Sequence, residues 1–573
     1  MGKKQYLKLL LNNIEIPKRP LLIAILISSL GSLSGLLIPY FAGNFVDDFV
    51  ASELDFNLIL YLAGIFFVST LLSGFGLFLL NKIGEDITYS LRNVLSSHII
   101  RLQVSFFDSN ETGNLVSRLL DDASVVSQFL TQKLPSLFPS ILVLLGSFFM
   151  LFIIDWKTTI LTFLLIPTLL LIMTPLSKKI QKISIFTQAR LADFSSNLSR
   201  VFSEIRLLKT SCTEIDELDK IKKNLDDIYA QGIKKAKISS IIQPISAFLI
   251  LITVGTILVY GGIRVSNGDI TTGNLISMIF YVVQLSGPLA VLASVMTDYQ
   301  LANGASIRLV EILNETPEYL TSTDHNIMIK EENIHFKNVC LKYDNELVLK
   351  NISFTIPSKK TTAIVGPSGS GKSTILNALA RLYPIESGSI LIGEHSIYDI
   401  ALENWRSEVG YIMQKYNLMN GTVRDNILYG IKRAVTEKEI TLITKIANCY
   451  DFIKELEFGF DTYVGEKGVK LSGGEAQRIN IARTFLKNPS LIFLDEATAN
   501  LDSENEQFIY QCLNNLSQSC TTVIVAHRLS TIQSADNIIF LDNGCITGQG
   551  SHLELMENHL KYRHFVELQN ANL

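Results

Sequence analysis

The chain has 573 residues, of which 48% are apolar, and its formal net charge is −4. With a mean hydropathy of +0.30 it is too apolar for an ordinary soluble protein, and it is too long for one ordinary domain. Its basic residues are scattered along the sequence rather than gathered into one stripe, which argues against a nucleic-acid-binding protein. These properties indicate a membrane protein with a soluble part attached.

Six long stretches without Asp, Glu, Lys or Arg occupy the first half of the chain. Each is near or above the roughly 20 residues that cross about 30 Å of hydrocarbon. We therefore predict six transmembrane helices, at residues 20–46, 56–81, 134–154, 158–177, 238–263 and 270–297. No isolated charge interrupts these spans, so no proton relay or buried counter-ion is visible.

Polar residues inside the spans leave two interpretations open. Tyr281, Gln284 and Ser286 in the sixth span and Gln243 in the fifth could line a substrate cavity, or they could form hydrogen bonds between helices. The apolar character of the spans favours amphiphilic compounds, lipids or hydrophobic peptides over sugars or ions as substrates.

The distribution of basic residues predicts the orientation. Lys and Arg are frequent before the first span and in the segments 82–133 and 178–237, whereas the loop 47–55 has none. Since basic loops remain in the cytoplasm, we expect a multi-pass protein of the cell membrane with a cytoplasmic amino terminus. The first span has no cleavage site behind it, so we expect it to stay as an anchor.

The two long cytoplasmic loops carry apolar residues at helical spacing, so we expect the spans to continue beyond the bilayer as long helices. At the tips of these loops lie FFDSNETGNLVSRLLDD (106–122) and SRVFSEIRLLKT (199–210). The residues alone allow two interpretations of these tips: solvated helical hairpins, or docking sites for another part of the protein.

A change of pattern divides the chain. We expect a membrane domain at 1–313, a polar linker at 314–332 that contains Pro317, and a second domain at 333–573. In the second domain, short β-branched runs such as TTAIVG, LIFLDE and TVIVAH alternate with helical patterns. This alternation predicts an α/β domain whose parallel sheet is covered by helices on both faces.

The string GPSGSGKST lies between the strand-like TTAIV and the helical ILNALARL, and it matches the phosphate-binding pattern G-x-x-x-x-G-K-[ST]. Backbone N–H groups and the helix amino terminus would surround the phosphates. Lys372 would bind the β- and γ-phosphates, and the Ser373 hydroxyl would ligate Mg²⁺. The predicted nucleotide-binding residues here are Gly366, Pro367, Ser368, Gly369, Ser370, Gly371, Lys372, Ser373 and Thr374.

Two acids follow the strand-like LIFL. Asp495 is placed to hold Mg²⁺, and Glu496 is placed to polarise the attacking water. His527, at the end of TVIVAH, is placed to donate a hydrogen bond to the γ-phosphate. Together with the phosphate loop, these residues predict a nucleotide hydrolase.

With these motifs in this order, nearly the whole chain resembles a bacterial ABC half-transporter of the exporter type. The resemblance implies an all-α six-helix transmembrane domain, followed by an α/β P-loop ATPase domain that uses ATP and Mg²⁺. It also implies that Tyr343 stacks on adenine, that Gln414 is a catalytic residue sensing Mg²⁺ and water, and that Asp502 lies where two ATPase domains meet. LSGGEAQR (471–478) is similar to the family signature, whose ATP-contacting residues here would be Ser472, Gly473, Gly474 and Glu475.

The same resemblance favours the docking interpretation of the loop tips. It makes 106–122 the first coupling segment, with matching residues at Phe106, Phe107, Asp108, Thr112, Gly113 and Arg118. It makes Glu204–Lys209 the second coupling segment. Since the signature of one chain completes the ATP site of another, a second half-transporter chain is implied.

The implied function is ATP-driven, multidrug-like export of hydrophobic or amphiphilic compounds, in which dimerisation of the ATPase domains powers alternating access. A dedicated exporter of a lipid or a peptide is the first alternative, and a non-transporting ATPase is the second. The intact residues Glu496 and His527 count against the second alternative, because a scaffold does not need turnover.

The signature departs from the family at Glu475, where Gln is usual. Ser472 and Glu475 form the pattern S-x-x-E, which predicts a capping box at the start of a helix. Against this, a carboxylate near the partner's γ-phosphate would weaken ATP-driven closure unless Arg478 offsets it. The interpretation that we favour is a homodimer. The alternative is a heterodimer in which this chain supplies the intact catalytic side.

Overall fold

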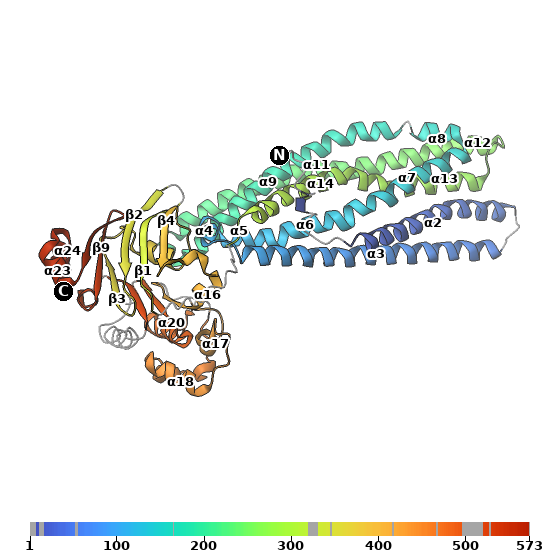
Figure 1. Cartoon of the computed structure of the whole chain (residues 1–573). Coiled ribbons are helices and arrows are strands. Elements are labelled where there is room, and N and C mark those ends of the chain that lie inside the picture. The colour runs from blue at the N-terminus through green and yellow to red at the C-terminus, as the bar shows by residue number, and fades with distance from the viewer. Residues whose placement is uncertain are drawn as a thin grey trace. The chain divides into compact units, whose positions relative to one another are not determined.

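The computed structural model of the chain (Figure 1) describes residues 7, 9–10, 17–51, 56–163, 165–318, 331–343, 346–414, 418–465, 468–495, 520–526 and 529–571. The chain forms two compact units. The helical unit comprises Met1–Ile100 and Thr112–Glu315, and the sheet unit comprises Arg101–Glu111 and Thr316–Leu573. These units follow spatial contacts rather than chain order, so the predicted domain and linker boundaries stay predictions.

Helices make up the described part of the helical unit (Figure 1). The long ones are α2 (Lys18–Val50), α3 (Phe56–Ile99), α7 (Leu134–Ile154), α9 (Leu165–Ser203), α11 (Glu214–Thr256), α13 (Thr272–Gln284) and α14 (Ser286–Asn314). The short ones are α5 (Thr112–Ser117), α6 (Ala123–Gln128), α8 (Trp156–Phe163), α10 (Ile205–Thr210), α12 (Gly262–Ser266) and the π-helical turns η1 (Arg118–Asp122), η2 (Phe129–Lys133) and η3 (Ile257–Gly261).

Four helical stretches in the described part of the chain are long and apolar enough to cross a membrane: Lys18–Val50, Phe56–Ile99, Thr112–Ile154 and Thr272–Asn314. They contain the first, second and third predicted spans and all but the first two residues of the sixth. The fourth and fifth predicted spans, 158–177 and 238–263, include residues whose backbone or side chain lies outside the description, so they stay predictions. Helices α3, α9 and α11 have 44, 39 and 43 residues. Each is roughly 60 Å long and therefore exceeds the bilayer, as expected.

Polar side chains of α13 hold this helix against α2. The hydrogen bonds run from Tyr281 Oη to Leu36 O (2.8 Å), from Gln284 Nε2 to Gly35 O (3.3 Å) and from Ser277 Oγ to Pro39 O (2.8 Å). For Tyr281 and Gln284 these contacts support the interhelical interpretation. Ser286 instead donates to Val283 O in its own turn, at 2.8 Å. The side chain of Gln243 lies outside the described part of the chain.

The backbones of α2 and α13 approach each other closely at two glycines. A Cβ atom on Gly43 would lie 2.5 Å from Gly273 O, and one on Gly273 would lie 2.0 Å from Gly43 O. Beside them, Asp47 accepts hydrogen bonds from Gly273 N at 2.7 Å and from Thr271 Oγ1 at 2.5 Å. Asp47 therefore fixes the amino-terminal end of α13 against α2, at a distance that only small residues permit.

Two sheets organise the sheet unit. The larger has the strand order β10-β9-β3-β8-β7-β6 and is parallel except for the pair β10–β9. Its strands are β3 (Thr361–Val365), β6 (Val409–Ile412), β7 (Leu491–Asp495), β8 (Thr521–Val525), β9 (Asn537–Asp542) and β10 (Cys545–Gly550). Along β7, Leu491 and Phe493 belong to one hydrophobic core, whereas Ile492 and Leu494 belong to another. Each face of this sheet is therefore covered. The core that contains Leu491 and Phe493 also includes residues of a second sheet, such as Phe336 and Phe354, so the expectation of helices on both faces is met only in part.

The second sheet is antiparallel, with the order β2-β1-β4-β5, and the sequence pattern did not anticipate it. Its strands are β1 (Ile334–Tyr343), β2 (Glu346–Ile356), β4 (Ser387–Ile392) and β5 (His395–Ser396). Phe336 and Phe354 stack across β1 and β2 with ring centroids 4.3 Å apart.

Short and medium helices complete the described part of the sheet unit (Figure 1). They are α4 (Val104–Ser109), α15 (Lys372–Leu379), η4 (Ile397–Asp399), α16 (Leu402–Ser407), α17 (Val423–Leu428), α18 (Glu437–Ile446), α19 (Tyr450–Glu455), η5 (Gly459–Asp461), α20 (Gly473–Lys487), α22 (Leu529–Gln533), α23 (His552–Asn558) and α24 (Leu560–Ala571).

Replacing Gly43 by Ala should destabilise the helical unit, because the added methyl group meets the backbone of α13. Overpacking of this kind typically costs about 1–3 kcal/mol. Gly64→Ala in α3 is the matched control, since a Cβ there has nothing within 4 Å. Thermal unfolding of the purified variants should give a lower Tm for Gly43→Ala and an unchanged Tm for Gly64→Ala. Equal Tm values would contradict the close approach.

Candidate functional site

The phosphate-binding string forms a loop between β3 and α15 at the carboxyl end of a parallel strand. Its glycines Gly366, Gly369 and Gly371 have φ values of +155°, +78° and +100°, which L side chains rarely adopt. A Cβ on Gly366 would lie 2.0 Å from Leu541 O of β9, so no side chain fits there. The loop thus brings backbone N–H groups and the amino terminus of α15 to one edge of the sheet, an arrangement suited to an anion.

Lys372 is buried, and its ammonium lies within this loop. Nζ donates to Gly366 O at 3.0 Å and to Pro367 O at 2.9 Å. Ser370 is also buried, and its Oγ has no hydrogen-bond partner among the described residues. A confined positive charge and an unsatisfied hydroxyl beside a ring of amides fit a polyphosphate. The other predicted residues of this motif, Ser368 and Thr374, lie in the loop and in α15.

Ser373 and Asp495, both predicted metal ligands, meet at this edge of the sheet. Ser373 Oγ donates to Asp495 Oδ1 at 2.8 Å. They meet because β3 and β7 are parallel and both pair with β8. A hydroxyl and a carboxylate oxygen at this distance fit Mg²⁺, which prefers oxygen ligands. Gln414, the third predicted ligand, is exposed and lies two residues beyond β6, the strand that pairs with β7.

Three predicted site residues, Glu496, Asp502 and His527, lie outside the described part of the chain. Their predicted roles in catalysis and in the contact between ATPase domains stay predictions. Glu496 directly follows β7 in the sequence and His527 follows β8 by two residues.

Tyr343 ends β1 and belongs to a group of aromatic and amide side chains. Its ring packs edge-on against Tyr383, with centroids 4.8 Å apart. Asn377 of α15 donates from Nδ2 to Tyr343 Oη at 3.2 Å, and its Oδ1 accepts from Tyr411 Oη at 3.1 Å. Burial, together with the nearby charge of Asp495, raises the pKa of the Tyr411 hydroxyl, which keeps it a neutral donor. The predicted stacking of Tyr343 on adenine stays a prediction.

Sequence reasoning missed Asn377 and Tyr411. Asn377 is five residues beyond Lys372 and Tyr411 is three residues before Gln414, so both lie close to recognised motifs. Their shared hydrogen bond joins α15 to β6, and no local pattern marks it. The sequence signal that could have pointed to this group is Asn377, a polar residue on the helix that follows the phosphate loop.

The first predicted coupling segment lies partly in the sheet unit. Arg101–Glu111, which contains α4, clusters with this unit, whereas Thr112, Gly113 and Arg118 belong to the helical unit. The Tyr383 hydroxyl donates to the carboxylate of Asp108 in α4. Burial first, and then this hydrogen bond, raises the pKa of Tyr383, so the phenol stays protonated. Because Tyr383 also packs on Tyr343, one side chain links α4 to the end of β1.

Glu318 of the predicted linker reinforces the same junction. Its two carboxylate oxygens accept from Arg406 Nη1 and Nη2 at 2.7 and 2.8 Å, a bidentate pair. Its backbone N–H donates to Arg101 O at 2.7 Å. The neighbouring Pro317 forms an isolated antiparallel bridge with Leu102. The start of the linker therefore packs on the segment that leads into α4.

The signature begins α20, and the predicted capping box is confirmed. Ser472 is the N-cap residue: Glu475 N donates to Ser472 Oγ at 3.3 Å, and Ser472 N donates to Glu475 Oε2 at 2.8 Å. Ser472 Oγ also donates to this carboxylate at 2.9 Å. Two donors of Ser472 thus hold the Glu475 carboxylate at the start of the helix. Gly473 and Gly474 form the first turn, and Ser472 is exposed.

The capping box predicts the stability of two pairs of variants. Glu475→Ala should lower the stability of the sheet unit by about 1 kcal/mol, and Glu475→Gln by much less, since an amide oxygen still accepts from Ser472 N. Ser551 and Glu554 form the same box at α23, so Glu554→Ala and Glu554→Gln are matched controls. Chemical unfolding of the full chain should rank both pairs alike. A large loss for Glu475→Gln alone would contradict this account.

Comparisons with known proteins identify the family of the chain. Residues 21–289 match the ABC transporter transmembrane region, and residues 349–499 match the ABC transporter family. Over 549 residues the chain is 35% identical to the "Multidrug resistance ABC transporter ATP-binding and permease protein" of Lactococcus lactis subsp. lactis, covering 96% of this chain and 93% of that protein. It is 33% identical to the "ATP-dependent lipid A-core flippase" of Desulfotalea psychrophila over 577 residues, covering 99% and 100%. The protein of the same name from Syntrophus aciditrophicus is 34% identical over 499 residues, covering 87% and 83%. The chain therefore belongs to the ABC transporter family: it joins a helical transmembrane domain of exporter type to an ATPase domain and couples ATP hydrolysis to transport.

Proposed function

We propose that this chain is one half of an ATP-driven exporter of hydrophobic or amphiphilic compounds. It works as a homodimer in the cell membrane, with its ATPase domain in the cytoplasm. The observation that carries the proposal is the 2.8 Å contact of Ser373 Oγ with Asp495 Oδ1 at a phosphate loop, in a chain whose described residues include four helical stretches of membrane-crossing length. Relatives named for multidrug resistance and for lipid flipping support an amphiphilic substrate class.

In this proposal, the phosphates of ATP bind the N–H groups of the loop from Gly366 to Gly371. The Lys372 ammonium exchanges its carbonyl partners for phosphate oxygens. Mg²⁺, when bound by Ser373, Asp495 and Gln414, would neutralise charge on the β- and γ-phosphates.

The remaining residues of the site act on the water, the γ-phosphate and the base. Glu496 accepts the proton of the attacking water, and His527 donates a hydrogen bond to the γ-phosphate. Tyr343 stacks on adenine. Asp502 lies where the two ATPase domains meet.

Two features support a second chain. One chain carries one phosphate loop and one signature, and Ser472 is exposed at the start of α20, where a second nucleotide site would reach it. The loop tip 199–210, which contains the second predicted coupling segment, exposes large apolar side chains: Phe202 is 66% exposed and Leu207 is 63% exposed. Exposed apolar residues at the tip of a helical hairpin are typical of a surface that a partner covers.

Coupling between ATP and the membrane helices follows from differential affinity. ATP that binds the closed dimer more tightly than the open one shifts the equilibrium toward closure. The path that we propose runs from Tyr343 through Tyr383 to Asp108 of α4, since Tyr383 contacts both residues. A shift of Tyr343 on adenine binding would therefore move the hydrogen bond that holds the first coupling segment.

The proposed catalytic base gives the direct test. The purified chain in lipid nanodiscs should hydrolyse ATP in the presence of Mg²⁺, and amphiphilic compounds should stimulate it. Glu496→Gln should lower the rate by at least about 100-fold, because it removes the general base. Glu554→Gln, the same change at an exposed helix cap, is the control with unchanged activity. An ATPase that no amphiphile stimulates would argue against export, and an inactive wild-type chain would argue against the homodimer.

A substitution at Glu475, where the family signature usually has Gln, provides a separate test of the homodimer. The donors of Ser472 already engage this carboxylate, so Glu475→Gln should change the KM for ATP by less than about twofold. Steady-state ATPase assays of this variant, with Glu554→Gln as control, measure the effect. A much larger fall in KM would mean that Glu475 opposes closure on ATP, and it would favour a heterodimer.

A further inference from the structure

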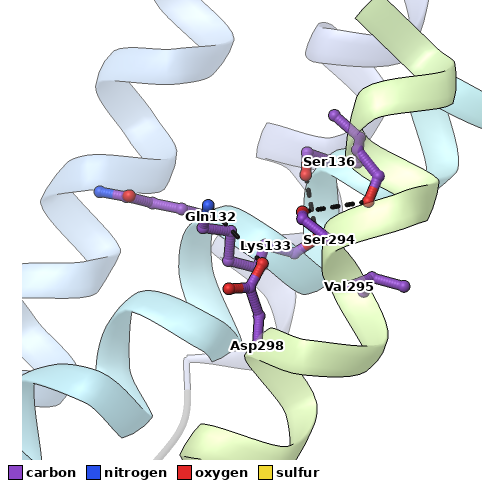
Figure 2. Close-up of a pocket in the computed structure, with 7 residues that line it drawn as sticks. Gln132, Lys133, Ser136, Ser294, Val295 and Asp298 are labelled. Atoms are coloured by element: carbon purple, nitrogen blue, oxygen red, sulfur yellow. Dashed lines mark hydrogen bonds and ion pairs between the residues drawn. The ribbon is translucent and has the colours of Figure 1, made fainter. Parts of the chain in front are cut away.

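A cavity of about 220 Å³ lies in the helical unit where η2 and α7 meet α14 (Figure 2). Its lining residues are Gln132, Lys133, Ser136, Val291, Ser294, Val295 and Asp298. Lys133 directly precedes the third predicted span, and Asp298 directly follows the sixth. The opposite charges of Lys133 and Asp298 therefore lie close together where these two predicted spans end, next to apolar helix surface.

The carboxylate of Asp298 is incompletely satisfied. Its side chain is 22% exposed, and its Oδ2 atom is buried without a hydrogen-bond partner among the described residues. Lys133 Nζ faces this atom at 3.6 Å, beyond hydrogen-bond distance (Figure 2). A buried carboxylate oxygen without a donor costs free energy. Lys133 is 46% exposed on a flexible stem, so a ligand could displace it toward solvent.

The other fixed polar groups of the cavity offer acceptors. Ser136 Oγ donates to Lys133 O at 2.9 Å, and Ser294 Oγ donates to Val291 O at 3.2 Å. A hydroxyl has one donor and two acceptor lone pairs, so each serine retains only acceptor capacity for a ligand. Gln132 Nε2 donates to Asn81 Oδ1 at 3.0 Å, which turns its amide toward α3. The cavity therefore combines a negative charge with hydroxyl acceptors, and its one cationic group is displaceable.

We infer that this cavity binds the protonated amine headgroup of an amphiphilic substrate, with Asp298 as its counter-ion. The inference rests on the proposed export function and adds a charge preference to it. The ammonium N–H groups donate to Asp298 Oδ2 and to the serine hydroxyls, while Val291 and Val295 contact the adjoining methylene groups. An anionic headgroup would meet the same carboxylate and lone pairs and be repelled. A neutral headgroup would add no positive charge to that of Lys133 beside Asp298.

The test compares three probes that share a dodecyl chain: dodecylamine, dodecanol and dodecyl sulfate. Each is titrated, below the concentrations that disrupt lipid, into the full chain in nanodiscs while ATPase stimulation is measured. The wild-type chain should respond to dodecylamine at the lowest concentration. Asp298→Asn should raise the half-maximal concentration of dodecylamine about tenfold, since a charge-assisted hydrogen bond is lost. The value for dodecanol should change by less than about twofold.

A second variant shifts the response in the opposite direction, which misfolding cannot do. Lys133→Met removes the resident ammonium that competes for Asp298, so dodecylamine should stimulate at a lower concentration. Asp86→Asn, at an exposed carboxylate of α3 outside the cavity, is the matched control with no selective shift. If Asp298→Asn shifts dodecylamine and dodecanol equally, or shifts neither, the inference is wrong while the proposed function stands. If none of the three probes stimulates the ATPase, both are wrong.

Discussion

Parallel pairing of β3, β8 and β7 is the constraint on which the nucleotide site depends. Parallel strands end at the same edge of a sheet, so the phosphate loop after β3 and Asp495 at the end of β7 meet there. The Ser373–Asp495 hydrogen bond joins residues 122 positions apart in the sequence. Gly366 lets the loop pass the backbone of β9, because any Cβ would collide with Leu541 O. Without this register the glycine-rich string would be a basic loop that lacks an acidic partner for a metal ion.

The same edge is connected to the segment that carries α4 by side chains with two contacts each. Asn377 holds Tyr343 and Tyr411 at once, and Tyr383 holds Tyr343 and Asp108 at once. Burial raises the pKa of Tyr383 and of Tyr411, so both hydroxyls are protonated donors at neutral pH. These contacts involve defined donors and acceptors, and the proposed coupling path runs through them.

In the helical unit, the hydrogen-bond partners of a polar residue indicate whether it has a structural role or could bind a ligand. Tyr281 and Ser277 find carbonyl partners on α2, so they hold two helices together. Asp298 Oδ2 is buried with no hydrogen-bond partner among the described residues, beside a lysine that is nearly half exposed. A polar group whose bonding is complete within the protein has little to offer a ligand, whereas an incomplete one gains from it. This distinction explains why a binding role is proposed for Asp298 and not for Tyr281.

Much of this protein could be predicted from interactions between residues that are close in the sequence. The lengths of the charge-free stretches, the glycine pattern of the phosphate loop and the capping box of Ser472 and Glu475 each depend on residues a few positions apart, and the sequence predicts them. The antiparallel sheet β2-β1-β4-β5, the Asn377–Tyr411 hydrogen bond and the approach of Lys133 to Asp298 could not be predicted in this way. Each of them joins residues that are distant in the chain. Their pairing is set by which elements pack together, and neither residue of such a pair carries a local mark of its partner.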